Sequence, residues 1–174
     1  MRENATWLLM YAVLPLLIAA AFFDWLCHRA TKIEATSGLR ENVVHWLMFG
    51  QIGTAVMVVA AFETNLAVLL WVGAAFALHE LTVWLELRYT VDKREVRPIE
   101  QVVHSFMELL PLVAFALLVV LAAPDFALRL RREHWPAGYT FYTIAAVLLF
   151  NILPLAEETW RCFRRRTRPP PAPR

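Results

Sequence analysis

Five runs of mostly apolar residues, separated by short polar segments, take up most of the 174-residue chain. Each run is close to the roughly 20 residues that a helix needs to cross a hydrocarbon layer about 30 Å thick. Backbone N–H and C=O groups find no water in that layer, so a spanning segment must satisfy them internally, as a helix does. The sequence therefore predicts an all-α integral membrane protein with five transmembrane helices, at residues 5–27, 43–62, 66–87, 99–123 and 139–156.

Two features of these runs refine the prediction. Pro15, Pro111 and Pro154 lie inside them, and because proline removes a helical hydrogen bond we expect a local distortion at each. The first run has some features of a signal peptide, but we interpret it as a permanent span because it carries ionisable residues with counterparts later in the chain. Four spans with one re-entrant or interfacial segment is the alternative arrangement.

Lys and Arg residues are divided unevenly between the two sides of the membrane. With five spans, thirteen of the 17 fall on the side of the C-terminus and four on the other side. Positive residues are concentrated in cytoplasmic loops, which predicts an N-terminus outside and a C-terminus in the cytoplasm. Residues 159–174 then form a basic, Pro-rich cytoplasmic tail. We interpret its arginines as an anchor beside the lipid bilayer and expect no nucleic-acid partner.

Two smaller features fit the same topology. Residues 131–135, which include His134, are typical of an interfacial amphipathic segment on the outer side and not of a binding site. Cys27 and Cys162 both fall on the cytoplasmic side, where thiols stay reduced, so we expect no disulfide.

An internal repeat organises the chain. A shift of 59 residues aligns residues 23–48 with residues 82–107 and gives nine identities, among them Glu41 with Glu100 and His45 with His104. This repeat predicts two tandem helical hairpins, spans 1–2 and spans 3–4, related by a pseudo-two-fold axis along the membrane normal. The expected architecture is a pseudo-two-fold four-helix transmembrane bundle with a fifth transmembrane helix on its outside.

Ionisable residues gather in the half of the spans that faces the cytoplasm. Residues four apart on a helix are turned by only about 40°, so Glu41 and His45 share one helical face, as do Glu100 and His104. A charge in hydrocarbon costs at least a few kcal/mol, so we expect these faces to point into the bundle. The spacing leaves open which of Glu80 and Glu86 points inward. The candidate metal ligands are Asp24, His28, Glu41, His45, His79, Glu80, Glu86, Glu100, His104 and Glu108.

Carboxylates crowded into one interior would repel each other and take up protons. A pair of divalent metal ions removes that repulsion, and mixed His and carboxylate ligands suit Fe, with Zn or Mn as alternatives, and not Ca, Mg or Cu(I). The arrangement resembles the soluble di-iron carboxylate four-helix bundles, in which two helices give a Glu and two give Glu-x-x-His. Here the spacing is Glu-x-x-x-His, and one Glu is replaced by Asp.

A di-iron centre in a bilayer would suit a membrane oxidoreductase that uses dioxygen on a lipid-like or quinone substrate, with a separate electron-donor protein. Whether the chain is catalytic stays open. The alternatives are a b-type cytochrome with bis-His haem, a zinc-dependent membrane hydrolase, and a metal-binding, transport or sensing protein without catalysis. An ion translocator is disfavoured because the outer halves of the first four spans are almost wholly apolar, so no polar path crosses the bundle.

Overall fold

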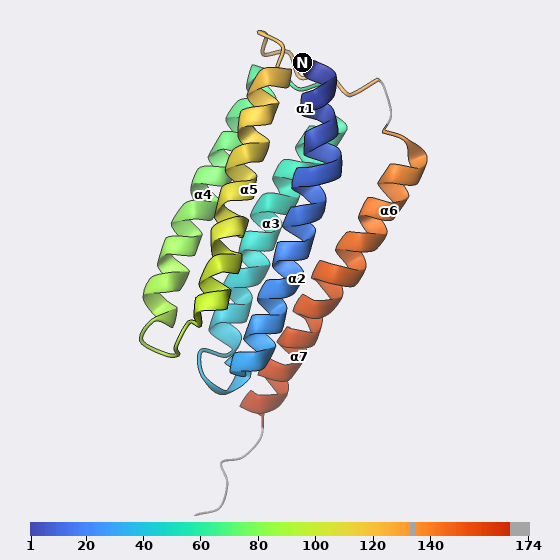
Figure 1. Cartoon of the computed structure of the whole chain (residues 1–174). Coiled ribbons are helices and arrows are strands. Elements are labelled where there is room, and N and C mark those ends of the chain that lie inside the picture. Colours follow the sequence, from blue (N-terminus) through green and yellow to red (C-terminus); the bar gives the residue numbers. More distant parts are fainter. Residues whose placement is uncertain (133–134, 168–174) are drawn as a thin grey trace, which may run out of the picture.

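The computed structural model describes residues 1–132 and 135–167, and within them the chain is largely helical (Figure 1). In this part, five continuous helices are long and apolar enough to cross a membrane, which is consistent with a multi-pass integral membrane protein. They are Arg2–Thr31, Leu39–Ala61, Leu66–Thr90, Pro98–Leu121 and Ala137–Arg166. The last helix continues past residue 156, so the first part of the expected tail is helical. Residues 168–174 and His134 lie outside the described residues.

Two of the spans contain a π-helical segment. The first span consists of α1 (Arg2–Leu8), η1 (Leu9–Val13) and α2 (Leu14–Thr31). The fifth consists of α6 (Ala137–Val147), η3 (Leu148–Ile152) and α7 (Leu153–Arg166). The remaining elements are η2 (Ile33–Ala35), α3 (Leu39–Ala61), α4 (Leu66–Thr90) and α5 (Pro98–Leu121).

The π-helical segments explain how two prolines are accommodated. A proline ring clashes with the carbonyl four residues earlier and donates no hydrogen bond. For Pro15 that earlier residue is Tyr11, and for Pro154 it is Phe150; both lie in the π-helical segments. The wider π turn relieves the clash. Pro111, by contrast, is buried inside an uninterrupted α5.

The spans form a ring in which neighbours in sequence are not always neighbours in space. α2 packs against α5, α5 against α4, α4 against α3, and α3 against α7, which returns to α2. α7 therefore fills the wall between α2 and α3 and separates the first two spans, which we expected to form one hairpin. We expected the fifth span to lie outside the bundle; instead its second half is part of the ring. α6 leans away from the other helices (Figure 1), and none of its residues is buried.

Polar contacts hold the fifth span against the first. Glu157 accepts hydrogen bonds from Trp25 Nε1, at 3.0 Å, and from Arg29, at 3.3 Å. Asn151, in η3, donates from its side-chain amide to the carbonyl of Ile18 at 3.0 Å. Groups of this kind have no water to bind within a bilayer, so they favour the position in which α7 meets α2.

The connections between the spans are short. The α2–α3 connection (32–38), the α4–α5 connection (91–97) and the end of α7 lie at one end of the molecule, called the basic end below, and the N-terminus lies at the other (Figure 1). Gly38 has a φ of +64°, a conformation that glycine adopts without steric cost, and donates its N–H to the carbonyl of Ile33 at 2.8 Å. Asn65 caps α4 by accepting a hydrogen bond from the N–H of Val68 at 3.1 Å.

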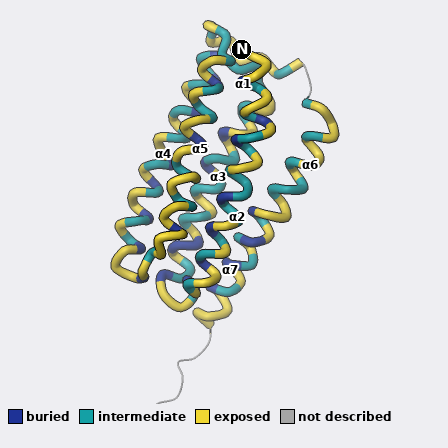
Figure 2. The backbone as a smooth tube through the Cα atoms, in the orientation of Figure 1, coloured by how far each residue is buried: buried dark blue, intermediate teal, exposed yellow. Residues whose placement is uncertain are grey.

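Burial differs between the two ends of the ring (Figure 2). Toward the N-terminal end, a small apolar cluster of Ala55, Val68, Val72 and Leu118 packs α3, α4 and α5 together. Many large apolar side chains are exposed on the outside, where lipid would surround them. Toward the basic end the buried side chains are mainly polar: Asp24, His28, Glu41, Asn42, His79, Thr82, Glu86, Thr90, Arg94, Glu100 and Glu158. The buried polar side chains therefore lie at the basic end, where most of the ionisable residues of the spans occur.

The two repeated segments share one local arrangement. The guanidinium of Arg29 lies over the ring of Trp25, 5.5 Å from its centroid. At the equivalent positions, the guanidinium of Arg88 lies over Trp84 at 4.7 Å. Cation–π contacts of this geometry anchor an arginine on an aromatic ring. The aligned residues thus make equivalent contacts as well as being identical.

Candidate metal centre

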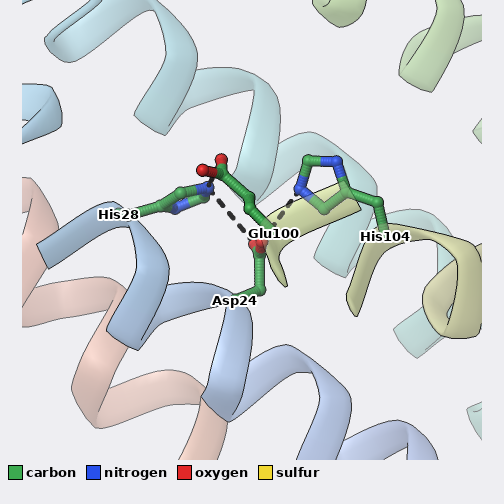
Figure 3. A group of neighbouring side chains, drawn as sticks. All are labelled: Asp24, His28, Glu100 and His104. Carbon is green, nitrogen blue, oxygen red and sulfur yellow. Dashed lines mark hydrogen bonds and ion pairs between the residues drawn. The ribbon is translucent and has the colours of Figure 1, made fainter. Parts of the chain in front are cut away.

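α2 and α5 bring four candidate ligands together. Asp24 and His28 lie one turn apart on α2 and face Glu100 and His104, one turn apart on α5 (Figure 3). One nitrogen or oxygen atom from each of the four lies within 4.8 Å of the others. Nε2 of His104 lies 2.9 Å from Asp24 Oδ1, a hydrogen bond that joins the two helices.

His28 has the most informative environment of the four. Its Nε2 atom is buried and has no hydrogen-bond partner among the described residues. It lies 3.4 Å from Asp24 Oδ2, 3.6 Å from Glu100 Oε1 and 4.0 Å from Glu41 Oε1. Two ligand atoms at tetrahedral corners, each about 2.1 Å from a metal ion, are about 3.4 Å apart. The Nε2 lone pair therefore meets carboxylate oxygens at the separation that metal ligands have from one another.

A second group lies beside the first. Glu41 and His45 on α3 meet Glu86 on α4, again with one ligand atom of each within 4.8 Å of the others. Nε2 of His45 lies 3.9 Å from Glu41 Oε1, beyond hydrogen-bonding distance. Thr90 donates its hydroxyl to Glu86 Oε1 at 2.6 Å, which fixes that carboxylate. Glu86 and not Glu80 joins this group, which answers the question that the sequence left open about which side chain points inward.

Glu158 on α7 connects the two groups. Its two carboxylate oxygens accept hydrogen bonds from Nδ1–H of His28 and Nδ1–H of His45, both at 3.1 Å. The two imidazole rings stack in parallel, with centroids 4.5 Å apart and planes 10° apart. A carboxylate on Nδ1–H fixes the tautomer and leaves the Nε2 lone pair free, as in the carboxylate–histidine–metal arrangement of known metal sites. Glu158 thus sets two Nε2 atoms side by side.

A chain of hydrogen bonds orients Glu158 in turn. Trp46 Nε1 donates to the hydroxyl of Thr159 at 2.8 Å, and that hydroxyl donates to Asn42 Oδ1 at 2.9 Å. The amide nitrogen of Asn42 then faces Glu158 and donates to its Oε1 at 2.9 Å. α3 and α7 are therefore joined by hydrogen bonds of consistent direction that end on Glu158 Oε1, which also accepts from Nδ1–H of His45.

Arg94, in the α4–α5 connection, covers the site from the basic end. Its guanidinium is buried and binds two repeat-related carboxylates, Glu41 Oε1 at 2.6 Å and Glu100 Oε1 at 2.5 Å. Both of these carboxylates have no exposed surface. Burial lowers the pKa of the Arg94 guanidinium, but the hydrogen bonds to Glu100 and Glu41 outweigh burial and raise the pKa above its ordinary value. Arg94 is thus a permanent positive charge beside the cluster.

Three of the ten candidates do not join these groups among the described residues: His79, Glu80 and Glu108. His79 is buried, and its Nδ1 atom has no hydrogen-bond partner within the described part of the chain. Glu80 and Glu108 are half-buried. The other seven lie together: Asp24, His28, Glu41, His45, Glu86, Glu100 and His104.

Two residues of the cluster were not expected from the sequence. Glu158 follows the last apolar run and was not among the candidate ligands. Its spacing held a signal, because Asn151, Glu158 and Cys162 are separated by seven and four residues, so they share one helical face, and all three are buried. Arg94 had been counted as a loop charge, and nothing in its local sequence distinguishes it from the arginines around it. Cys27 and Cys162 are free thiols, as expected.

Comparisons with known proteins returned nothing similar: no protein-family model, no curated protein and no solved structure matches the chain. We therefore infer the function of the chain from the geometry of the cluster.

Proposed function

We propose that this chain holds a dinuclear centre of divalent metal ions and that iron is the resident metal. One ion would take Asp24, His28, Glu100 and His104. The observation that carries this proposal is the buried Nε2 atom of His28, which has no hydrogen-bond partner among the described residues and lies 3.4 Å and 3.6 Å from oxygens of Asp24 and Glu100. The second ion would take the neighbouring group of Glu41, His45 and Glu86.

The charge of the cluster supports two ions. Five carboxylates and one guanidinium leave four negative charges when the imidazoles are neutral, and two divalent ions would balance them. Without metal, that charge would have to be offset by protons on the imidazoles or carboxylates. The residues in this count are Asp24, Glu41, Glu86, Glu100, Glu158 and Arg94.

Mixed imidazole and carboxylate ligands favour iron over calcium or magnesium. When bound, a carboxylate-rich iron pair supplies dioxygen activation, which suits oxidation of a lipid-like or quinone substrate with electrons from a partner protein. The chain's own residues would hold and orient the ions. Glu158 keeps the Nε2 atoms of His28 and His45 free of protons. Arg94 closes the basic end against water and neutralises one carboxylate charge.

A bis-His haem fits this geometry less well. Two axial ligands must face each other across the macrocycle, whereas His28 and His45 stack in parallel with ring centroids 4.5 Å apart. The rings of His28 and His104 are 6.5 Å apart, but carboxylate oxygens of Asp24 and Glu100 lie 3.4 and 3.6 Å from His28 Nε2, in the space that the macrocycle would need. Two alternatives would use the same ligands. A zinc pair that activates water for hydrolysis would differ from the iron proposal in the identity of the bound metal. A metal transporter or sensor would differ in showing no catalytic turnover.

The topology proposed for the site follows from charge. The positive residues concentrated at the basic end support a cytoplasmic position for it, which would put the N-terminus outside and the metal centre in the cytoplasmic half. The repeat also has a functional meaning in this proposal. Glu41 and Glu100 are equivalent positions that serve different metal ions, as expected if a duplicated hairpin gave rise to a pseudo-two-fold site.

Elemental analysis tests the proposal. Protein purified in detergent should contain about two iron atoms per chain and show no Soret band. Glu100→Gln should lower the metal content by about one ion, because it removes a ligand of one group only. His79→Ala is the matched control, since His79 is buried in the same region but outside both groups. Wild-type protein without stoichiometric metal would overturn the dinuclear centre, and stoichiometric zinc would replace the oxidoreductase proposal with the hydrolase.

A further inference from the structure

An apolar cavity lies in the ring toward the N-terminal end. It has a volume of about 280 Å³ and is lined by residues of η1, α2, α3, α4, α5 and α6. Val72 and Phe76 of α4 and Ala114 and Leu118 of α5 form its far wall. Because four different spans contribute to the lining besides α6, this is an interior space and not a groove on one helix pair.

On one side the cavity is covered by α6, the half of the fifth span that leans away from the ring. At the basic end α7 closes the ring between α2 and α3, but α6, the other half of the same span, diverges (Figure 1). Tyr139, Thr143 and Ile144 of α6 line the cavity, although no residue of α6 is buried. Tyr139 also donates its hydroxyl to the carbonyl of Met10 in η1 at 3.0 Å, so α6 forms the wall of the cavity on this side.

The register of the helices places the cavity directly above the metal-ligand cluster. Leu17, Ile52 and Pro111 line the cavity, and each lies seven residues from a cluster residue on its own helix, namely Asp24, His45 and His104. Seven residues are two helical turns, about 10 Å, and return to nearly the same face of the helix. On three helices, then, the face that carries a ligand also lines the cavity two turns further on.

Between the metal-ligand cluster and the cavity, the interior of the ring changes from polar to apolar. Gln51 donates from its side-chain amide to the hydroxyl of Thr82 at 2.9 Å, and both residues are buried. Met48 and Met107, equivalent residues of the repeat, stand three residues after His45 and His104 on their helices. Methionine side chains are flexible and adapt to neighbouring groups. Along α3 and α4, the buried pair of Gln51 and Thr82 therefore lies between the positions of the cluster and those of the cavity.

We propose that this cavity binds the hydrocarbon tail of a membrane lipid, entering sideways past α6, with the end of the tail two turns from the cluster. If the cavity were empty, the side chains that line it would lose van der Waals contacts. Water would not be stable there, because the apolar lining offers it few hydrogen-bond partners. Lipid tails are the one apolar ligand present at high concentration at this depth. That the tail is the group on which the metal centre acts rests on the function proposed above, and it narrows the substrate from lipid-like or quinone to a lipid with a long apolar chain.

Photocrosslinking tests the tail site. The full chain would be reconstituted in phosphatidylcholine vesicles whose lipid carries a diazirine at the end of one tail, and the labelled residues would be mapped by mass spectrometry. We expect label on the inner residues Val72, Phe76 and Ala114. Ala114→Trp should reduce labelling of Val72 and Phe76 at least fivefold, because the indole fills the cavity. Ala116→Trp is the matched control, since Ala116 lies two residues away on the exposed side of α5 and should leave inner labelling unchanged.

Label confined to outward-facing residues in the wild-type chain would overturn the proposal, as would inner labelling that Ala114→Trp does not reduce. Val72→Phe, a second cavity-filling change on a different helix, should reduce labelling of Phe76 and Ala114 and guards against misfolding of one variant. Both fillers should keep the wild-type metal content. Labelling does not require metal, so a chain without stoichiometric metal but with inner labelling would refute the metal centre and leave the tail site standing.

Discussion

Replacing Glu158 with Gln should weaken one of the two metal positions and spare the other. Glu158 Oε1 accepts from both Asn42 and His45, while Oε2 accepts from His28 alone. The amide of Asn42 can donate only to an oxygen, so the Gln oxygen should keep the Oε1 position and the Gln NH2 should face His28 Nδ1. His28 would then have to accept at Nδ1 and carry its proton on Nε2, the atom proposed to bind metal.

The size of the effect follows from the loss of one tautomer. Loss of such an orienting carboxylate typically lowers metal affinity 10- to 100-fold, or about 1.4–2.8 kcal/mol. We expect that loss for the ion held by His28, Asp24 and Glu100, and a change of less than about threefold for the ion held by His45. Competition with a chelator, followed by elemental analysis, separates the two affinities. Glu157→Gln is the control, because that carboxylate binds Trp25 and Arg29 and neither imidazole.

An equal loss of affinity for both ions would refute the assignment of hydrogen bonds around Glu158. An unchanged affinity for both would refute its role in positioning the imidazoles.

Two further predictions concern stability. Arg94→Met leaves Glu41 and Glu100 buried without their counter-charge, so the metal-free protein should lose about 3–5 kcal/mol of unfolding free energy, measured by denaturant titration in detergent; a change below about 1 kcal/mol would show that the guanidinium is not needed there. Gly38→Ala should cost about 1 kcal/mol because Gly38 has a φ of +64°. Gly53→Ala, inside α3 with no atom within 4 Å of the added methyl group, should instead be neutral or stabilising by up to about 1 kcal/mol, and equal effects at both positions would contradict this reasoning.

The spans could be predicted from sequence because hydrocarbon imposes one requirement on every residue of a spanning segment. Helical periodicity likewise predicted which ionisable side chains share a face, and Asp24 with His28 and Glu100 with His104 do lie together. Glu86, seven residues from His79, is buried, whereas the half-buried Glu80 is not part of either group. These are properties of single helices, which the local sequence determines.

The residues that were missed depend on how separate helices meet. Glu158 lies past the apolar run, so it was not counted among the candidate ligands, although the helix continues there and brings Glu158 to His28 and His45. Arg94 is a loop residue by sequence, and its guanidinium is buried where Glu41 of α3 and Glu100 of α5 meet. The position of α7 between α2 and α3 could not be read from the repeat, because the fifth span has no counterpart in it.

Anomalous scattering at the iron edge, from crystals of the purified chain, would locate the two metal ions proposed for the cluster. Two peaks are expected in the cluster, one about 2.1 Å from His28 Nε2 and one about 2.1 Å from His45 Nε2. Crystals with full side-chain density, no anomalous peak, and carboxylates joined directly to protonated imidazoles would contradict the dinuclear centre.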